Sequence, residues 1–535
     1  MDLEPTSNDR PWRDRLIIVV ACCLLWLPLL AGRVLWHPDE PRFALLTLGM
    51  LQTGEYVAPL KMGEVYSSKP LLHLWATAAV SAALGGVDEI SMRIPSFLTA
   101  LLCVLATYAL GTAMFGARAG LFAALVLATD VRYLTQAGWA STDILLCFFM
   151  TAALVCFHAG YRTRQGRWYL LTHLFCALGT LTKGPVGFVL PGLIVLVFLI
   201  AQRDLHEILR LRLVEAILIT LALVGPWLML YARRAGGDDT WTLLVTENIH
   251  RYLHAWNNEH PWHYYLWRFP VDFLPWTLVL PAAVWYSRTL EAKERRFLWI
   301  WFAVVFLFYS ASRGKRGVYI LPLHPPAAIL VGWFWDRAAR ASWPGANGWL
   351  RAGRWGMGGT FAVLGASMAW MAPRLIEGLD GAGRVGVTLW ALLTSTAGIA
   401  IILQPAKRTI ALTALAIALA SAGIAHGVAA STQREELTEF AAEIARQVPT
   451  DAPLGIVTHA EELAFYAVRI PAAELRPGKL MRRWLETPGT IYMLLDEECL
   501  DDLRSRSGQQ WEALAERKLW KGDFHVVVRR SNEEG

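Results

Sequence analysis

Long apolar runs alternate with short polar stretches over the first 430 residues, and a polar tail follows. Each run is long enough, or nearly so, to cross a bilayer, which takes about 20 apolar residues in a helix. The runs centre near residues 26, 104, 124, 151, 175, 192, 222, 278, 304, 326, 364, 395 and 418. The pattern predicts an all-α polytopic membrane protein with about thirteen transmembrane helices. The segment Leu71–Leu84 is short for a span, so we expect it to be interfacial or re-entrant.

The polar tail has its own pattern. Glu435–Gln447 has the spacing of an amphipathic helix. Three stretches read as short strands, with further helical stretches between them: Leu454–Thr458, Thr490–Leu495 and Phe524–Arg529. We therefore predict a small soluble α/β domain at 431–535, following a transmembrane domain at 1–430.

Composition supports membrane insertion. The chain is 55% hydrophobic and only 18% charged, too little charge to cover a soluble protein of 535 residues. Its net charge of +6 is spread over loops without a long basic run, so membrane lipids are expected partners and nucleic acid is not. The seven cysteines form no disulfide framework and no zinc-site spacing.

Positive charge predicts the orientation. Arg10, Arg13 and Arg15 place the N-terminus in the cytoplasm. An odd number of crossings then puts the C-terminal domain outside the cytoplasm, on the same side as a long first loop at 37–93. The expected fold is thus a helical membrane bundle with a small extracytoplasmic α/β domain.

One expected outer turn violates the charge rule. Arg313, Lys315 and Arg316 crowd a turn on the side where cations are normally scarce. Either the topology is locally wrong, or the turn binds an anionic group at the outer membrane surface.

The first loop carries the most informative polar residues. His37-Pro38-Asp39-Glu40-Pro41-Arg42 follows the first apolar run, and Ser67-Ser68-Lys69-Pro70 comes later in the same loop. Carboxylates beside a membrane are expensive unless they line a wet cavity. The stretch is either a functional site or an ordinary solvated loop.

The topology brings further ionisable and aromatic groups to the same side. They come from separate outer segments: Asp39, Glu40, Arg42, Lys69, Asp143, Lys183, Glu247, Arg251, Lys315, Arg316, Tyr319 and His324. Each alone could simply lie at a helix end with its charge in water. Together, carboxylates and cations next to lipid suit chemistry on an amphiphile with a phosphate head.

The order of the motifs resembles that of the GT-C glycosyltransferases. The motifs are Asp-Glu-x-x-Phe, Lys-Pro-Leu-Leu-x-x-Trp, Arg-x-Pro-Ser, Asp-x-x-Leu, Leu-Thr-Lys-Gly-Pro, Glu-Asn-x-x-Arg-Tyr, Pro-Trp-x-Tyr-Tyr and Ser-x-x-Lys-x-x-x-Tyr-x-Leu-Pro. They are most similar to the bacterial branch that includes lipid A aminoarabinose transferases and protein O-mannosyltransferase-like relatives. The likeness covers about residues 14–340.

This resemblance implies transfer of a sugar from a polyprenyl-phosphate donor to a lipid, glycan or protein acceptor at the periplasmic face. It implies that Asp39 is the site residue most closely tied to catalysis. With the chemistry of the residues, it makes Asp39, Asp143 and Glu40 catalytic candidates. The candidates for binding the donor phosphate are Arg42, Lys69, Lys183, Arg251, Lys315, Arg316 and Tyr319.

Two departures from the resemblance concern a cofactor. Lipid A transferases typically have a glutamate where this chain has Ser68, and a histidine where it has Asn248. Both positions are associated with a divalent metal in those relatives. Their joint replacement puts a divalent metal in doubt, and with it lipid A as the acceptor.

Two other functions remain open. A transporter or flippase of lipid-linked sugars would also bind a polyprenyl phosphate, but carriers often contain internal repeats and place charges near the membrane centre. This chain has no evident repeat, and its charges gather at one face. A non-catalytic scaffold would leave Asp39, Lys69 and Lys183 without a chemical role.

Overall fold

The computed structural model describes residues 11–30, 34–35, 39–61, 64–254, 258–340, 346–375, 381–403, 413, 433–449, 452, 454–456, 465–466, 472–474, 490–507, 511–519 and 522–529. The apolar run expected near residue 418 lies outside these residues, as does Thr458.

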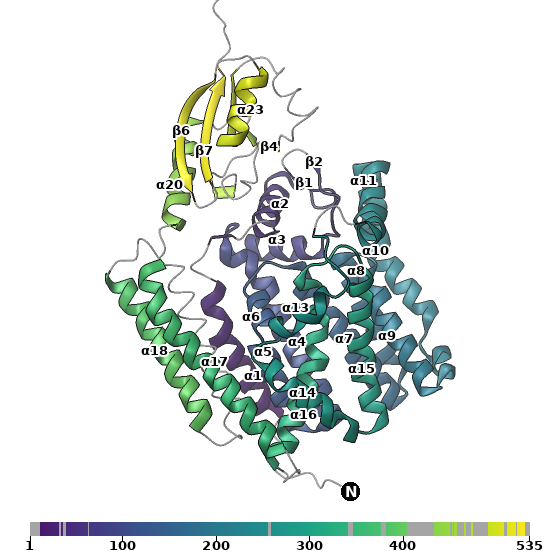
Figure 1. Ribbon diagram of the computed structural model, residues 1–535. Helices are drawn as coiled ribbons and strands as arrows, with labels where there is room; N and C mark the ends of the chain where they lie inside the picture. The colour runs from purple at the N-terminus through teal and green to yellow at the C-terminus, as the bar shows by residue number, and fades with distance from the viewer. Residues whose placement is uncertain are drawn as a thin grey trace, which may run out of the picture.

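The first 403 residues form a helical bundle (Figure 1). Its longer helices are α1 (Pro11–Leu30), α2 (Asp39–Thr53), α3 (Leu72–Leu84), α4 (Glu89–Phe115), α5 (Ala117–Thr129), α7 (Thr142–Thr163), α8 (Gly166–Lys183), α9 (Val186–Gln202), α10 (Leu213–Ala235), α15 (Ala292–Ala311), α16 (His324–Arg340), α17 (Ala346–Leu375) and α18 (Gly381–Leu403). Shorter helical segments are α6 (Val131–Ala137), η1 (Leu205–Arg210), α11 (Gly237–Trp241), η2 (Thr242–His250), α12 (Arg251–Leu253), α13 (Tyr264–Asp272), η3 (Trp276–Leu278), α14 (Leu280–Tyr286), η4 (Ser287–Thr289) and η5 (Gly317–Leu323). A small hairpin of β1 (Leu60–Lys61) and β2 (Glu64–Val65) follows α2.

The bundle is that of a membrane protein. Among the described residues, four segments are long and apolar enough to cross a bilayer: Glu89–Phe115, Thr142–Thr163, Leu213–Ala235 and Gly317–Ala338. α10 leaves large apolar side chains such as Leu218 and Leu221 about 60% exposed, which suits contact with lipid. The 13-residue α3 is shorter than a typical span, as the sequence predicts.

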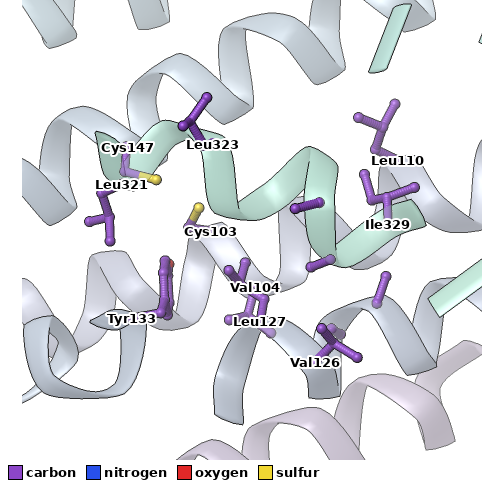
Figure 2. Close-up of a cluster of buried hydrophobic side chains, with 14 of the residues drawn as sticks. Cys103, Val104, Leu110, Val126, Leu127, Tyr133, Cys147, Leu321, Leu323 and Ile329 are labelled. Carbon is purple, nitrogen blue, oxygen red and sulfur yellow. The ribbon is translucent and has the colours of Figure 1, made fainter. Parts of the chain in front are cut away.

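Small residues allow the central helices to pack closely. A Cβ added at Gly120 of α5 would overlap the backbone of α4, and one at Gly332 of α16 would overlap the backbone of α5. Figure 2 shows Val104, Leu127 and Ile329, one from each of these helices, in the resulting apolar cluster. The close approach of α16 to α5 positions η5, which leads into α16.

The C-terminal segment contains the predicted helix, α20 (Gln433–Gln447), and a five-stranded sheet of order β4-β3-β5-β7-β6. Its elements are β3 (Leu454–Ile456), β4 (Ala472–Glu474), β5 (Ile491–Asp496), α23 (Glu497–Ser507), β6 (Glu512–Leu519) and β7 (Gly522–Arg529). β3 runs parallel to β4 and β5, whereas β7 is antiparallel to β5 and β6. β3, β5 and β7 are the three predicted strands.

Helix α23 lies between the second and third predicted strands, as expected, whereas Glu512–Leu519 forms a further strand, β6, that was not predicted. Its residues, Glu-Ala-Leu-Ala-Glu-Arg-Lys-Leu, have high intrinsic helix propensity. Pairing with β7 along most of its length overrides that local preference.

The C-terminal segment packs against the helices around the first loop. Leu437 and Phe440 of α20 belong to the same buried apolar cluster as Phe43 of α2. Tyr466 adds a polar contact, because its hydroxyl lies 3.0 Å from the amide nitrogen of Leu35 and 2.9 Å from Oε1 of Glu89. In Figure 1 the yellow sheet lies at the α2 end of the bundle, opposite the N-terminus.

Candidate functional site

A cavity of about 200 Å³ lies where the first turns of α2 and α7 meet the Arg316 turn. Its wall includes the predicted site residues Asp39, Glu40, Asp143 and Arg316. Much of the remaining wall is formed by Gln136 of α6, by Trp139 and Ser141 between α6 and α7, and by Thr142 at the start of α7. The structure thus brings together groups from sequence positions almost 280 residues apart.

Glu40 lies at the centre of a buried hydrogen-bond network. Its two carboxylate oxygens accept from Nε and a terminal nitrogen of Arg93 at 2.9 and 3.0 Å, and Oε1 also accepts from the amide of Ala140 at 2.9 Å. Arg93 additionally donates to the carbonyls of Leu30 and Val34. Both ionic side chains are almost fully buried, so this network joins α2, α4 and the chain before α7.

The Arg-x-Pro-Ser motif supplies both anchors from α4. Arg93 holds the start of α2, and Ser96 one turn later accepts a hydrogen bond from the amide of Ser141 at 3.0 Å. Ser141 in turn caps α7 by accepting from the amide of Asp143. The motif therefore positions both Asp39 and Asp143.

Asp39 faces two arginines. Its carboxylate accepts from Arg316 at 2.8 Å and lies 3.7 Å from Arg42, one turn along α2. The side chain is about one quarter exposed, toward the cavity. Burial alone would raise the pKa of this carboxyl, but the positive charges of Lys69, Arg316 and Arg42 hold it well below its usual range.

A second ionic pair forms where α7 begins and α8 ends. Lys183, the last residue of α8, forms a salt bridge with Asp143 in the first turn of α7. Its ammonium lies 4.2 Å from the centre of the Tyr319 ring, in cation–π contact. These positions place a carboxylate at a helix N-terminus and a cation at a helix C-terminus, as the helix dipoles favour.

Lys69 lies between the two ionic pairs. Its ammonium donates to the hydroxyl of Thr142 at 3.4 Å. Burial, only partly offset by the charges of Asp39 and Asp143, lowers the pKa of Lys69 to about 8. The predicted site residues thus include one connected group, which consists of Asp39, Arg42, Lys69, Asp143, Lys183, Arg316 and Tyr319.

Two predicted phosphate-binding residues make other contacts. Arg251 forms a salt bridge with Glu247 at 2.6 Å. The Lys315 ammonium is only 3% exposed and donates to the backbone carbonyls of His260 and Ser312, which places it inside the cationic turn. His324, which the sequence groups with the outer residues, is fully buried in a pair with Asp130 and does not line the cavity.

The residues around Asn248 do not fit a divalent metal. The Asn248 amide nitrogen donates to the carbonyl of Leu243 at 2.8 Å, and the neighbouring Glu247 carboxylate is engaged by Arg251. Ser68 supplies only a hydroxyl, a weaker ligand than a carboxylate. In the described part of the chain, no three His, Cys, Asp or Glu side chains are grouped to hold a metal ion.

Sequence reasoning assigned no role to Arg93 or Gln136. The sequence could have indicated a structural role for Arg93, because an arginine inside an apolar helix needs a buried partner. Gln136 lies in a short polar stretch, and nothing in its sequence neighbourhood indicates that it lines the cavity.

Known proteins share this architecture. Residues 13–243 match the family model described as dolichyl-phosphate-mannose-protein mannosyltransferase. The crystal structure of ArnT from Cupriavidus metallidurans bound to undecaprenyl phosphate superposes with a TM-score of 0.80, covering 98% of this chain and 99% of that one at 21% identity. The chain has the ArnT fold. This confirms the predicted resemblance to GT-C glycosyltransferases.

Other relatives extend the comparison with ArnT. An undecaprenyl phosphate-α-4-amino-4-deoxy-L-arabinose arabinosyl transferase of Pseudomonas fluorescens is 32% identical over 337 residues, 61% of this chain and 57% of the relative. A Pseudomonas aeruginosa protein of the same description is 34% identical over 328 residues, 59% of this chain. The matched region spans less than two thirds of these curated relatives. The archaeal oligosaccharyltransferase AglB from Archaeoglobus fulgidus shares the fold more distantly, with a TM-score of 0.54, 13% identity and coverage of 99% of this chain and 75% of that one.

The Glu40–Arg93 network predicts a large stability effect. Replacing Arg93 by Met removes the buried counter-ion of Glu40, and we expect a loss of about 3–5 kcal/mol of unfolding free energy. Thermal unfolding in detergent, compared with the wild type, measures the change. Arg234→Met is the matched control, because Arg234 pairs with Glu55 at the surface and should contribute below about 1 kcal/mol. Equal losses in the two variants would contradict the structural importance of the buried pair.

Proposed function

We propose that this protein transfers a sugar from a polyprenyl-phosphate donor to an acceptor at the periplasmic face of the bacterial inner membrane. The acceptor is lipid A, another envelope glycan, or protein. One observation carries the proposal: the Asp39 carboxylate and its partner Arg316 line one cavity at one end of a membrane bundle that has the ArnT fold, and Lys69 lies close by. The names of the similar arabinosyl transferases support an undecaprenyl-phosphate donor.

We propose the following topology. Residues 1–430 form the catalytic domain with about thirteen crossings, its N-terminus is cytoplasmic, and residues 431–535 form a periplasmic domain. The arginines at the start of the chain, Arg10, Arg13 and Arg15, support this orientation. So does the packing of the C-terminal segment against α2, whose first turn carries Asp39.

The cations account for departure of the lipid phosphate. As the bond between the sugar and the phosphate oxygen breaks, the leaving phosphate gains negative charge. The carboxylates of the cavity are surrounded by Lys69, Lys183 and Arg316. These cations can exchange their carboxylate partners for phosphate oxygens of the donor. Arg42 and Tyr319 lie beside them. Fixed cations at this point lower the barrier, because they need little rearrangement during reaction.

We assign Asp39 the role of the base that takes the proton of the acceptor hydroxyl. Its carboxylate accepts a hydrogen bond from the acceptor hydroxyl and takes the proton as the new glycosidic bond forms. In the free protein the cations make Asp39 a weak base. When the donor phosphate engages Arg316 and Lys69, part of that positive charge is neutralised, so Asp39 becomes more basic once the donor is bound. Asp143 assists by holding Lys183.

The remaining predicted site residues have supporting roles. Glu40 is engaged by Arg93 and a backbone amide, so we assign it to positioning Asp39 rather than to proton transfer. Lys315 holds the turn that carries Arg316. Arg251 remains a candidate for the rim of the donor site, through exchange of its Glu247 partner.

An apolar groove can accept the start of the donor's isoprenoid tail. The groove has a volume of about 290 Å³ and is lined by side chains such as Phe269, Leu280 and Phe302. Tyr265 lines the same groove, and its hydroxyl donates to the carbonyl of Arg316 at 3.1 Å. A donor whose phosphate lies at Arg316 could therefore keep its tail between helices.

We also propose that transfer needs no divalent metal at the Ser68 and Asn248 positions. Each carboxylate near those positions already has a cationic partner: Asp39 has Arg316 and Glu247 has Arg251. Protein cations then supply the positive charge for the leaving phosphate.

Transfer in vitro tests the function directly. Purified protein is supplied with a panel of polyprenyl-phosphate sugars and an envelope extract, and we expect transfer from at least one donor.

Asp39→Asn should lower the rate by about 10²–10³-fold while leaving the protein folded. Glu55→Gln, which breaks another carboxylate–arginine pair on the α2 side, should retain activity. Full activity of Asp39→Asn would remove Asp39 from the mechanism, and no transfer by folded wild-type protein would favour a flippase.

The depressed pKa of Lys69 predicts a pH dependence. If its charge binds the donor phosphate, kcat/KM should fall as the pH rises through about 8, because Lys69 loses its proton. Lys69→Arg retains its charge throughout this range, so its profile should stay flat to higher pH. An unchanged descending limb in Lys69→Arg would assign the titration to another group.

Metal independence predicts that EDTA leaves the transfer rate unchanged and that purified protein contains no stoichiometric transition metal. The double variant Ser68→Glu/Asn248→His restores the ligand types of the relatives and should gain bound zinc, measured by elemental analysis. Stoichiometric metal in the wild type, with activity lost in EDTA and restored by that metal, would refute the proposal.

A further inference from the structure

Gln136 is a buried polar residue that the proposed chemistry leaves unused. It lines the cavity together with Asp39, Asp143 and Arg316, yet the residue is only 1% exposed. Its side-chain nitrogen has no hydrogen-bond partner among the described residues. A buried polar group without a partner costs about 1–3 kcal/mol. Such a cost at a cavity wall indicates a ligand that supplies the missing contact.

The backbone that carries Gln136 is firmly held. Asp130 caps α6 by accepting from the amide of Tyr133 at 3.0 Å, and it also pairs with the buried His324. The Tyr133 hydroxyl donates to the carbonyl of Ala100 on α4 at 3.0 Å. These contacts fix α6, which carries Gln136 at the cavity wall, against its neighbours.

The rest of the wall defines the ligand. Its three carboxylates are each paired with a cation: Asp39 with Arg316, Glu40 with Arg93, and Asp143 with Lys183. In the free protein a ligand ammonium group thus finds no unpaired carboxylate in this wall, and the Asp39 carboxylate released when the donor phosphate binds is assigned to the acceptor hydroxyl. The volume of about 200 Å³ is below the roughly 300–1,000 Å³ typical of pockets for drug-sized ligands, so it suits one sugar ring.

We propose that Gln136 binds the donor's sugar directly, and that the cavity selects a neutral, hydroxyl-bearing sugar over one that carries an ammonium group. This inference rests on the proposed glycosyl transfer and names its substrate class. The neutral amide can donate to one hydroxyl oxygen and accept from another, and Trp139 offers an aromatic surface to the apolar face of the ring.

A matched pair of donors tests the selection. Polyprenyl-phosphate arabinose and its 4-amino-4-deoxy analogue differ only in a hydroxyl or an ammonium group. We expect wild-type kcat/KM to favour arabinose by at least about tenfold, and Gln136→Glu to shift the ratio toward the amino sugar by about 10–100-fold. Gln202→Glu is the control, because Gln202 also has a buried, unpartnered side-chain nitrogen but does not line this cavity.

Gln136→Met separates binding from stability. It removes an unsatisfied amide while keeping the length of the side chain, so the unfolding temperature should stay equal or rise while kcat/KM for arabinose falls about tenfold or more. The inference is overturned if the wild type prefers the amino sugar, if Gln136→Glu behaves like Gln202→Glu, or if Gln136→Met retains full kcat/KM.

Failure of the proposed reaction has a different signature. Wild-type protein that transfers no sugar from the whole donor panel would overturn the proposed function. Equilibrium binding of the two matched donors then tests the selectivity of the cavity by itself. Tighter binding of arabinose, reversed in Gln136→Glu, supports the selection, whereas equal binding of the two donors refutes it.

Discussion

The geometry of the site depends on a buried ion pair that lies behind it. Arg93 holds both oxygens of Glu40 and two backbone carbonyls, and Glu40 also accepts from the amide of Ala140. Removing two charges from water is costly, so such a pair is weak evidence of added stability. Its consequence is geometric, because the pair fixes the first turn of α2, which begins at Asp39, to α4. Ser96 of α4 also holds the start of α7.

The pairing of carboxylates with cations links this geometry to the binding of a donor phosphate. Asp39 and Asp143 each carry a cationic partner in the free protein, and Lys69 lies between them with a lowered pKa. A phosphate entering this group replaces carboxylates as the partner of the cations. In the proposed reaction, donor binding and activation of Asp39 are therefore one electrostatic event, which would make a proton acceptor available only when there is a sugar to transfer.

The cavity and the apolar groove suit different parts of an amphiphilic donor. Apolar side chains between α13, α14, α15 and α16 can accept a lipid tail, whereas the paired charges and Gln136 surround a small polar cavity. The Arg316 turn joins them, because its carbonyl accepts from Tyr265 of the groove while its guanidinium reaches Asp39. An amphiphilic donor can thus react without leaving the membrane.

The sequence alone determined the membrane-protein class, the main helices and three C-terminal strands, since apolar periodicity is a local property. It also indicated the outer charged residues and, through the order of motifs, the GT-C resemblance. Only the tertiary structure decided that β6 is a strand, that Glu40 is engaged by Arg93, that His324 is buried, and that Gln136 lines the cavity. Those outcomes depend on partners distant in the chain, which override local propensity and cannot be read from neighbouring residues.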